Sequence, residues 1–339
     1  MQRTIYFDYL RVIACFAVII LHVSALQYSA YVESPFEWSV INVYDSATRF
    51  CVPIFIMISG ALFLDPARKI SLMRLYTHNI LRIVTSFLFW SFIYACYVYT
   101  PNEPPSFITL FLWGHVHVWF LWLIVGLYML IPILRTIAQN RLVMKYFLFL
   151  SVTLGFVIPF VFEFIRSFIP SLSQIVVMGE MCYEKSHIQL FSGYTSYFVL
   201  GYYLHSTQIN RKKENIFLVL GMFAGISIAV LTYMLFNKIG PVDEAFDNYD
   251  TLLVLLETVA VFLFVKRYAN RESKIVLSFS QHSFGIYLIH MLVYYMLGPD
   301  TITVNLIMGI PLVSIWVLIA SYVIILCLSR IPIINRWLI

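Results

Sequence analysis

Three ionisable side chains lie on one face of the first apolar segment of the chain. Asp8 and Arg11 are three positions apart, and His22 lies 11 positions after Arg11. At 3.6 residues per turn this spacing places all three on one helix face, with Arg11 and His22 roughly 16 Å apart. We therefore predict a site in which Arg11 meets the anionic end of a long cytoplasmic substrate and His22 takes a proton near its reactive end.

A structural interpretation of the same charges stays open. Arg11 would then extend its guanidinium to the cytoplasmic interface, and His22 would bond to a neighbouring helix. In the second apolar segment, Asp45 and Arg49 have the i,i+4 spacing of an intrahelical ion pair. Because charged side chains are costly at bilayer depth, they are usually either functional or paired there. The spacing alone does not decide between these two interpretations.

Two further features of the second and third apolar segments bear on donor binding. The pair Ser59-Gly60 is typical of close packing between membrane helices. Arg82 begins the third segment and belongs to a basic rim that also contains Arg68, Lys69 and Arg74. Such a rim either contacts anionic lipid headgroups or receives nucleotide phosphates.

Histidine and aromatic side chains recur in the later segments. His117 and Trp119 open the fourth segment, where an aromatic belt is the usual interpretation, and His290 follows Tyr287 by one turn in the ninth. Glu257 in the eighth segment is an isolated carboxyl group without an assigned role. We expect no metal site, since neither H-x₃-H nor HExxH occurs, and the P-loop, GxGxxG and GxSxG motifs are absent as well.

The elements that must position these residues are membrane helices. The chain has 339 residues, of which 61% are hydrophobic and 12% charged, and its mean hydropathy is +0.86. A soluble domain carries about 25% charged residues, so this composition excludes soluble, disordered, disulfide-stapled and fibrous classes. The five cysteines form no CxxC pair. The fold class is therefore all-α, a polytopic integral membrane bundle in the lipid bilayer, and the net charge of +5 does not indicate a nucleic-acid partner.

Ten apolar segments are long enough to cross the bilayer, and together they form one membrane domain over residues 1–339. We expect the first to be retained rather than cleaved as a signal peptide, because Asp8 and Arg11 interrupt it. The ten segments are Ile5–Tyr28, Val40–Leu64, Ile80–Tyr99, His117–Leu134, Leu142–Ile165, Ile188–Leu204, Ile216–Phe236, Tyr249–Val265, His282–Leu297 and Ile302–Leu328.

The distribution of basic residues predicts the orientation of the bundle. Eighteen of the 22 Lys and Arg residues fall at the chain ends and in alternate loops on one side. By the positive-inside rule this side is cytoplasmic, and an even number of spans places both termini there.

Five segments in order resemble the membrane proteins of acyltransferase family 3. The first is Phe7–Arg11 followed, after ten intervening residues, by His22, an Arg-x10-His pattern. The others are SATRFCVPIFIMISGALF from Ser46, HVWFLWLIVGLYMLIPIL from His117, FSGYTSYFVLGYYL from Phe191 and SFGIYLIHMLV from Ser283. Within the family, the chain is similar to stand-alone O-acetyltransferases that act on enterobacterial common antigen and other surface polysaccharides, and we expect no appended soluble domain.

The resemblance implies transfer of an acetyl group from cytoplasmic acetyl-CoA to a hydroxyl of a surface polysaccharide or lipid-linked sugar, across the bacterial inner membrane. It implies no permanently bound cofactor, and it leaves a homo-oligomer open. His22 would be the catalytic base or acyl carrier, Arg11 would help to hold the donor, and Asp8 would fix that guanidinium. Less settled positions are Arg82, Arg49 and Ser59 on the donor side, and His117, Trp119, Tyr287 and His290 in supporting or acceptor-side roles.

Two other functions suit ten spans with a few interior charges. One is a secondary transporter or flippase for a lipid-linked saccharide, which inverted repeats would favour, and the sequence contains none that we detect. The other is a membrane-embedded sensor or assembly partner in which the ionisable stripe of the first segment is structural.

Overall fold

The computed structural model describes residues 3–101, 103–187, 193–240, 245–298 and 305–339, and every regular element in these ranges is helical. Short 3₁₀ segments are η1 (Tyr28–Tyr31) and η4 (Pro170–Leu172), and π-helical segments are η2 (Leu75–Ile80) and η3 (Thr153–Val157). The α-helices are α1 (Ile5–Ala25), α2 (Pro35–Ser46), α3 (Cys51–Phe63), α4 (Leu72–Arg74), α5 (Leu81–Val98), α6 (Phe107–Trp113), α7 (Trp119–Gln139), α8 (Arg141–Val152), α9 (Ile158–Phe168), α10 (Ser173–Lys185), α11 (Tyr194–Ser206), α12 (Arg211–Ile239), α13 (Leu252–Tyr268), α14 (Lys274–Leu297), α15 (Leu306–Leu328) and α16 (Pro332–Trp337).

The helical bundle predicted from hydropathy is confirmed, with eight helical runs in the described residues long and apolar enough to cross a membrane. The other two expected segments are shorter. The sixth forms α11, of 13 residues, and its first part at 188–192 lies outside the described residues. The eighth forms α13, of 17 residues, because Thr251 caps the helix start by accepting a hydrogen bond from the Val254 amide. Residues 302–304 of the tenth segment also lie outside the described ranges.

The second expected segment is not one continuous helix. It divides into α2 and α3, with a turn at residues 47–50 that contains Arg49. Pro53 is the third residue of α3 and has no amide hydrogen to donate back to the carbonyl of Arg49, so the hydrogen-bonding ladder is interrupted there. Asp45 and Arg49 thus face each other across a break rather than within one continuous helix.

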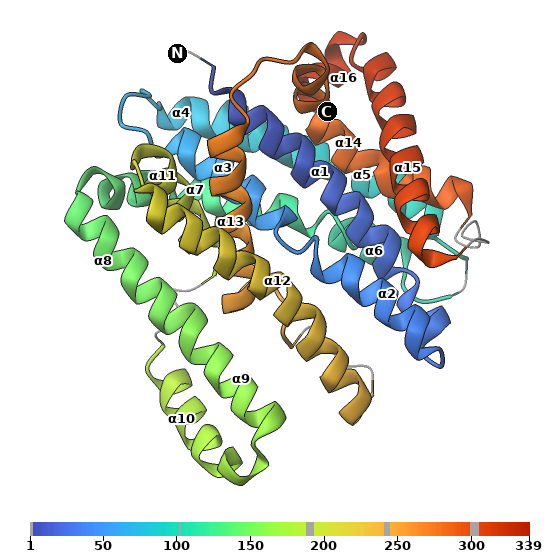
Figure 1. Cartoon of the computed structure of the whole chain (residues 1–339). Helices are drawn as coiled ribbons and strands as arrows, with labels where there is room; N and C mark the ends of the chain where they lie inside the picture. The colour runs from blue at the N-terminus through green and yellow to red at the C-terminus, as the bar shows by residue number, and fades with distance from the viewer. Residues whose placement is uncertain (1–2, 102, 188–192, 241–244, 299–304) are drawn as a thin grey trace.

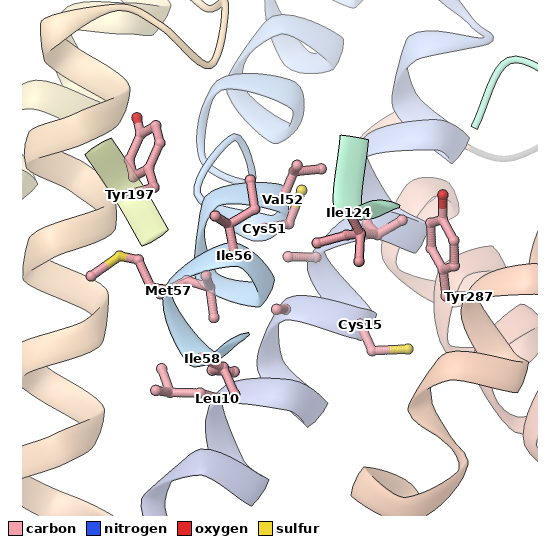
Figure 2. Packing of buried hydrophobic residues seen from close by; sticks show 14 of the residues in the cluster. Leu10, Cys15, Cys51, Val52, Ile56, Met57, Ile58, Ile124, Tyr197 and Tyr287 are labelled. Atoms are coloured by element: carbon pink, nitrogen blue, oxygen red, sulfur yellow. The ribbon is translucent and has the colours of Figure 1, made fainter. Parts of the chain in front are cut away.

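Helices α1 and α3 form the centre of the bundle (Figure 2), where Leu10 of α1 lies beside Ile58 of α3 and Cys15 of α1 points toward α14. Helix α3 crosses α11 at two glycines. A Cβ atom on Gly60 would lie 1.7 Å from the carbonyl oxygen of Phe198, and one on Gly201 would lie 2.1 Å from that of Met57. Only glycine permits this backbone contact, so the packing role predicted for Ser59-Gly60 is confirmed.

The two chain ends lie toward the same end of the bundle in Figure 1, which agrees with an even number of crossings. The short helices α4 and α16 lie at this end as well, whereas α10 lies at the opposite end, beyond α9. The charge distribution described above predicts that the end that carries the termini is cytoplasmic.

Candidate functional site

A cavity of about 350 Å³ lies between α1, α3, η2, α5, α7 and α14. Four residues predicted from the sequence line it together, namely Arg11, Ser59, Arg82 and Tyr287. The rest of its wall is mainly apolar and aromatic, with His78 and Asn79 beside Arg82. The cavity therefore has two guanidinium groups and an apolar lining, which suits a ligand with an anionic end and a long, weakly polar arm.

Asp8 lies within hydrogen-bonding distance of the guanidinium of Arg11. Asp8 is 5% exposed, and its Oδ1 accepts hydrogen bonds from Ser280 Oγ at 2.7 Å and Arg11 Nη1 at 3.4 Å. Its Oδ2 accepts from Arg3 Nε at 2.8 Å. Two cations share one carboxylate here, so the cluster keeps a net positive charge.

A second cavity, of about 390 Å³, opens on the other side of Arg11. It is lined by Arg3, Asp8 and His205 among others, and it shares Arg11 and Leu62 with the first cavity. Arg11 therefore stands between two spaces, one toward the chain termini and one toward the middle of the bundle. This places a cation where a ligand passing from one cavity to the other would meet it.

The C-terminal segment holds Arg82 in place. The guanidinium of Arg82 donates to the backbone carbonyl of Ile339. Nearby on α5, Ser86 Oγ donates to the carbonyl of Trp337 and Trp90 Nε1 to that of Leu338, each at 3.0 Å. Three successive backbone carbonyls are thus bound by one face of α5, next to the cavity wall. The sequence gives no sign of this contact, because it joins residues about 250 positions apart.

Three of the predicted histidines come together from three different parts of the chain. The ring centroids of His22 and His290 are 5.3 Å apart, those of His117 and His290 5.1 Å, and those of His22 and His117 6.2 Å. His22 lies on α1, His117 precedes α7, and His290 lies on α14. Each was predicted separately, and the helix packing unites them in one cluster, which we call the histidine cluster.

Hydrogen bonds to backbone carbonyls determine which ring nitrogen carries the hydrogen in His290 and in His117. His290 Nδ1 lies 2.6 Å from the carbonyl oxygen of Tyr287, and His117 Nε2 lies 3.3 Å from that of Leu288. Since a carbonyl oxygen only accepts, both nitrogens carry a hydrogen. In the neutral ring, Nε2 of His290 is then a bare acceptor, and it is buried with no partner in the described part of the chain. His22 makes no hydrogen bond to any described residue, and it is not among the residues that line the cavity.

A fourth histidine, His115, was not among the predicted site residues. Its Nδ1 lies 2.8 Å from His117 Nδ1, and its Nε2 lies 3.0 Å from the hydroxyl of Tyr295. Burial lowers the pKa of His115 to about 4, so the ring is neutral near pH 7. Because His117 uses Nε2 as its donor, its Nδ1 accepts from His115, and Tyr295 donates to His115 in turn. The His-x-His spacing before α7 was the one available signal for this residue.

Tyr287 separates the cavity from the histidine cluster. Its ring lines the cavity, and its hydroxyl donates to the backbone carbonyl of His117. The ring centroid of Tyr287 is 5.6 Å from that of His117 and 6.0 Å from that of His290. The deep end of the cavity therefore lies one side chain away from the histidines.

Arg49 does not line the cavity. Its Nε donates to Asp45 Oδ2 at 2.7 Å, and its Nη2 pairs with Asp247 at 2.7 Å. All three residues are at least nine-tenths buried, with exposures of 6%, 0% and 5% for Arg49, Asp45 and Asp247. The predicted pairing of Asp45 with Arg49 is confirmed, and the additional partner, Asp247, comes from the segment before α13.

Trp119 also lies apart from the cavity. Its side chain is 37% exposed, and its ring centroid is 5.9 Å from that of Tyr194 and 6.0 Å from that of Tyr249. Trp119 begins α7, only two residues after His117. A partly exposed aromatic group thus begins α7, two residues along the chain from one member of the histidine cluster.

Comparisons with known proteins bear on what this arrangement does. A family model described as an acyltransferase domain matches residues 4–329 of the chain. No curated protein and no solved structure matches the chain.

Within the described residues, no group of three or more His, Cys, Asp or Glu side chains is arranged to hold a metal ion.

Proposed function

Since the chain belongs to acyltransferase family 3, the family whose model covers residues 4–329, we propose that it moves an acetyl group from cytoplasmic acetyl-CoA to a sugar hydroxyl. The acceptor would be a surface polysaccharide or a lipid-linked sugar, and the protein would act in the bacterial inner membrane. The observation that carries this proposal is that Arg11 lines an apolar cavity whose far wall, Tyr287, lies against the histidine cluster; we call the line from Arg11 to this cluster the path.

The dimensions of the path suit coenzyme A. The two cavities meet at Arg11, and the inner one ends at Tyr287, beside the histidines. On one helix, Arg11 and His22 are separated by roughly 16 Å, which is similar to the length of an extended pantetheine arm. The donor phosphates would lie at Arg11 and Arg3, with Arg82 at the cavity wall and Ser59 beside the arm. The thioester would then lie near His22.

The chemistry requires a base and a route for one proton. The acceptor hydroxyl oxygen attacks the thioester carbonyl carbon, and the carbon–sulfur bond breaks after the tetrahedral intermediate. His22 takes the hydroxyl proton and returns it to the departing thiolate, so atoms and charge balance. If His22 instead carries the acetyl group, the acyl-imidazole forms first with release of the thiol, and the sugar hydroxyl then displaces the ring.

The other histidines would support His22. The ring of His290 lies 5.3 Å from that of His22, and we propose that its bare Nε2 accepts a hydrogen bond from the His22 ring or from the acceptor hydroxyl. His117 cannot rotate freely, because both of its ring nitrogens are bonded. Trp119 and Tyr249 would provide an aromatic surface on which a sugar ring stacks, and the Arg49 network would stabilise the helix break beside it.

Purified protein with acetyl-CoA carrying a labelled acetyl group tests the proposal. We expect slow hydrolysis of the thioester by the wild type, or transfer of the label when sugar acceptor is added. The variant His22→Ala should bind acetyl-CoA but release no label, whereas Arg11→Ala should weaken donor binding. Thr136→Val is a matched control, since its hydroxyl bonds only within its own helix. Binding of a glycolipid without any turnover of acetyl-CoA would favour a transporter or flippase instead.

A further inference from the structure

Two ring contacts between α3 and α7 mark the two ends of the cavity of about 350 Å³. The ring centroids of Phe55 and Phe120 are 6.2 Å apart, and those of Phe63 and Tyr128 are 4.6 Å apart. All four residues line the cavity. The second contact lies eight positions after the first on both helices, so α3 and α7 run in the same direction here. The cavity therefore extends for about 12 Å between the two contacts.

The end of the cavity at Phe63 is cationic. The guanidinium of Arg68 lies over the Phe63 ring, 4.7 Å from its centroid. Arg11 lies at this end as well, because it lines the neighbouring cavity of about 390 Å³ together with Ala61 and Leu62, which directly precede Phe63. The anionic part of a donor would bind at this end, and its arm would extend from there toward the other end.

The opposite end of the cavity consists of three rings from three helices, which we call the aromatic end. Phe120 of α7 contacts Phe55 of α3 and also Tyr287 of α14, with 5.7 Å between the ring centroids of Phe120 and Tyr287. The Tyr287 ring is held in place, since its hydroxyl donates to the backbone carbonyl of His117. In the described part of the chain, no Lys or Arg side chain lies over any of these three rings.

The aromatic end limits an acyl group both in size and in charge. Each methylene group that is added to the acyl chain has to displace a ring, and one methylene group in an apolar pocket changes selectivity by about 10- to 200-fold. A carboxylate would lose its water here without gaining a cation. Arg82, which lines the cavity too, is bound to the backbone carbonyl of Ile339 and lies over the ring of Phe284.

From these contacts we propose that Phe120 sets the acyl specificity of the protein, so that the cavity accepts a short, uncharged acyl group and rejects longer or carboxylated ones. Phe120 has this role because it is the ring that contacts both of the others at the aromatic end. Tyr287 is less suited to a test, since it also lies beside the histidine cluster. This inference rests on the proposed function, because it takes the ligand of the cavity to be an acyl-CoA.

Binding of three coenzyme A analogues to the full-length protein tests the inference. They carry acetyl, butyryl or succinyl groups, and a methylene group replaces the thioester sulfur so that the acyl group cannot be transferred. Butyryl and succinyl chains have the same number of carbons and differ in charge. We expect the wild type to bind the acetyl analogue at least about tenfold more tightly than the other two. Phe120→Ala should reduce the preference over butyryl to about threefold or less and keep the preference over succinyl.

Two further variants keep the test interpretable. Phe120→Leu retains more of the packing and should give an intermediate change, so it replaces Phe120→Ala if thermal melts show that the latter does not fold. Trp122→Ala is the matched control, since Trp122 is 51% exposed, packs on Phe87 and does not line the cavity.

The outcomes separate this inference from the proposed function. Equal affinity of the wild type for the three analogues overturns the inference and leaves the proposed function intact. The same change of preference in Trp122→Ala as in Phe120→Ala, or equal gains for butyryl and succinyl in Phe120→Ala, also overturns it. Failure of the wild type to bind any of the analogues or coenzyme A itself contradicts the proposed function, and the inference with it.

Discussion

Gly60→Ala adds one methyl group at the crossing of α3 and α11. The new Cβ atom would lie 1.7 Å from the carbonyl oxygen of Phe198, whereas real Cβ contacts stay above about 3.0 Å. The two helices must therefore separate by roughly 1.3 Å, and each is fixed by buried neighbours on its other faces. Overpacking of this kind costs about 1–3 kcal/mol, and here the obstacle is backbone, so we expect the upper end of that range.

The functional effect of Gly60→Ala follows from the same displacement. Ser59 and Ile58 line the cavity that also contains Arg11 and Tyr287, away from the contact of Gly60 with α11. A shift of α3 therefore changes the width of this cavity. We expect a lower melting temperature in detergent together with weaker binding of acetyl-CoA. The matched control is Gly126→Ala on α7, where a Cβ atom would meet nothing within 4 Å. There, the higher helix propensity of alanine should leave the stability unchanged or raise it by up to about 1 kcal/mol. Equal melting temperatures for the two variants would refute the reasoning.

Three other predictions concern the charges and hydrogen bonds around the site. Arg49→Gln leaves the buried carboxylates of Asp45 and Asp247 without their shared cation, so it should lower the free energy of unfolding by about 3–5 kcal/mol. Asp247→Asn should lower it by less, and thermal melts of the two variants will measure the difference. Trp90→Phe removes one of the hydrogen bonds that hold the C-terminal segment against α5, so the position of Arg82 becomes less fixed. We expect this variant to bind acetyl-CoA about three- to tenfold more weakly in titrations. An unchanged affinity would contradict this prediction. His290→Phe keeps a ring but removes the bare Nε2, and it should lower the transfer rate at saturating acetyl-CoA without changing donor affinity, as steady-state kinetics will measure.

Features that lie within one helix could be predicted from the sequence. Asp8 and Arg11 share a helix turn, so their contact follows from helical geometry alone, and Ser280 is the partner that geometry could not supply. Most of the membrane-spanning helices could be identified from the apolar segments, because about 20 consecutive apolar residues are stable in the bilayer core but not when exposed to water. Ser59-Gly60 is a local signal of close packing, and the structure places it at a helix crossing.

Features that depend on how helices pack could not be predicted. The proximity of His22 to His290 depends on the packing of α1 against α14, which hydropathy does not specify. The break between α2 and α3 lies within a segment that is long enough to form one span, so segment length gave no indication of it. Asp247 joins Arg49 from a polar stretch that is assigned to a loop by composition. Long-range partners of this kind need tertiary structure.

The most direct test of the central claim is the acetyl content of surface glycans in a strain that lacks this chain. The strain is complemented with the wild type or with His22→Ala, both confirmed at equal levels in the membrane, and the glycans are analysed by mass spectrometry. We predict that acetylated glycan is absent from the deletion strain, returns with the wild type and does not return with His22→Ala. Wild-type acetylation in cells carrying His22→Ala would contradict the assignment of the chemistry to the histidine cluster.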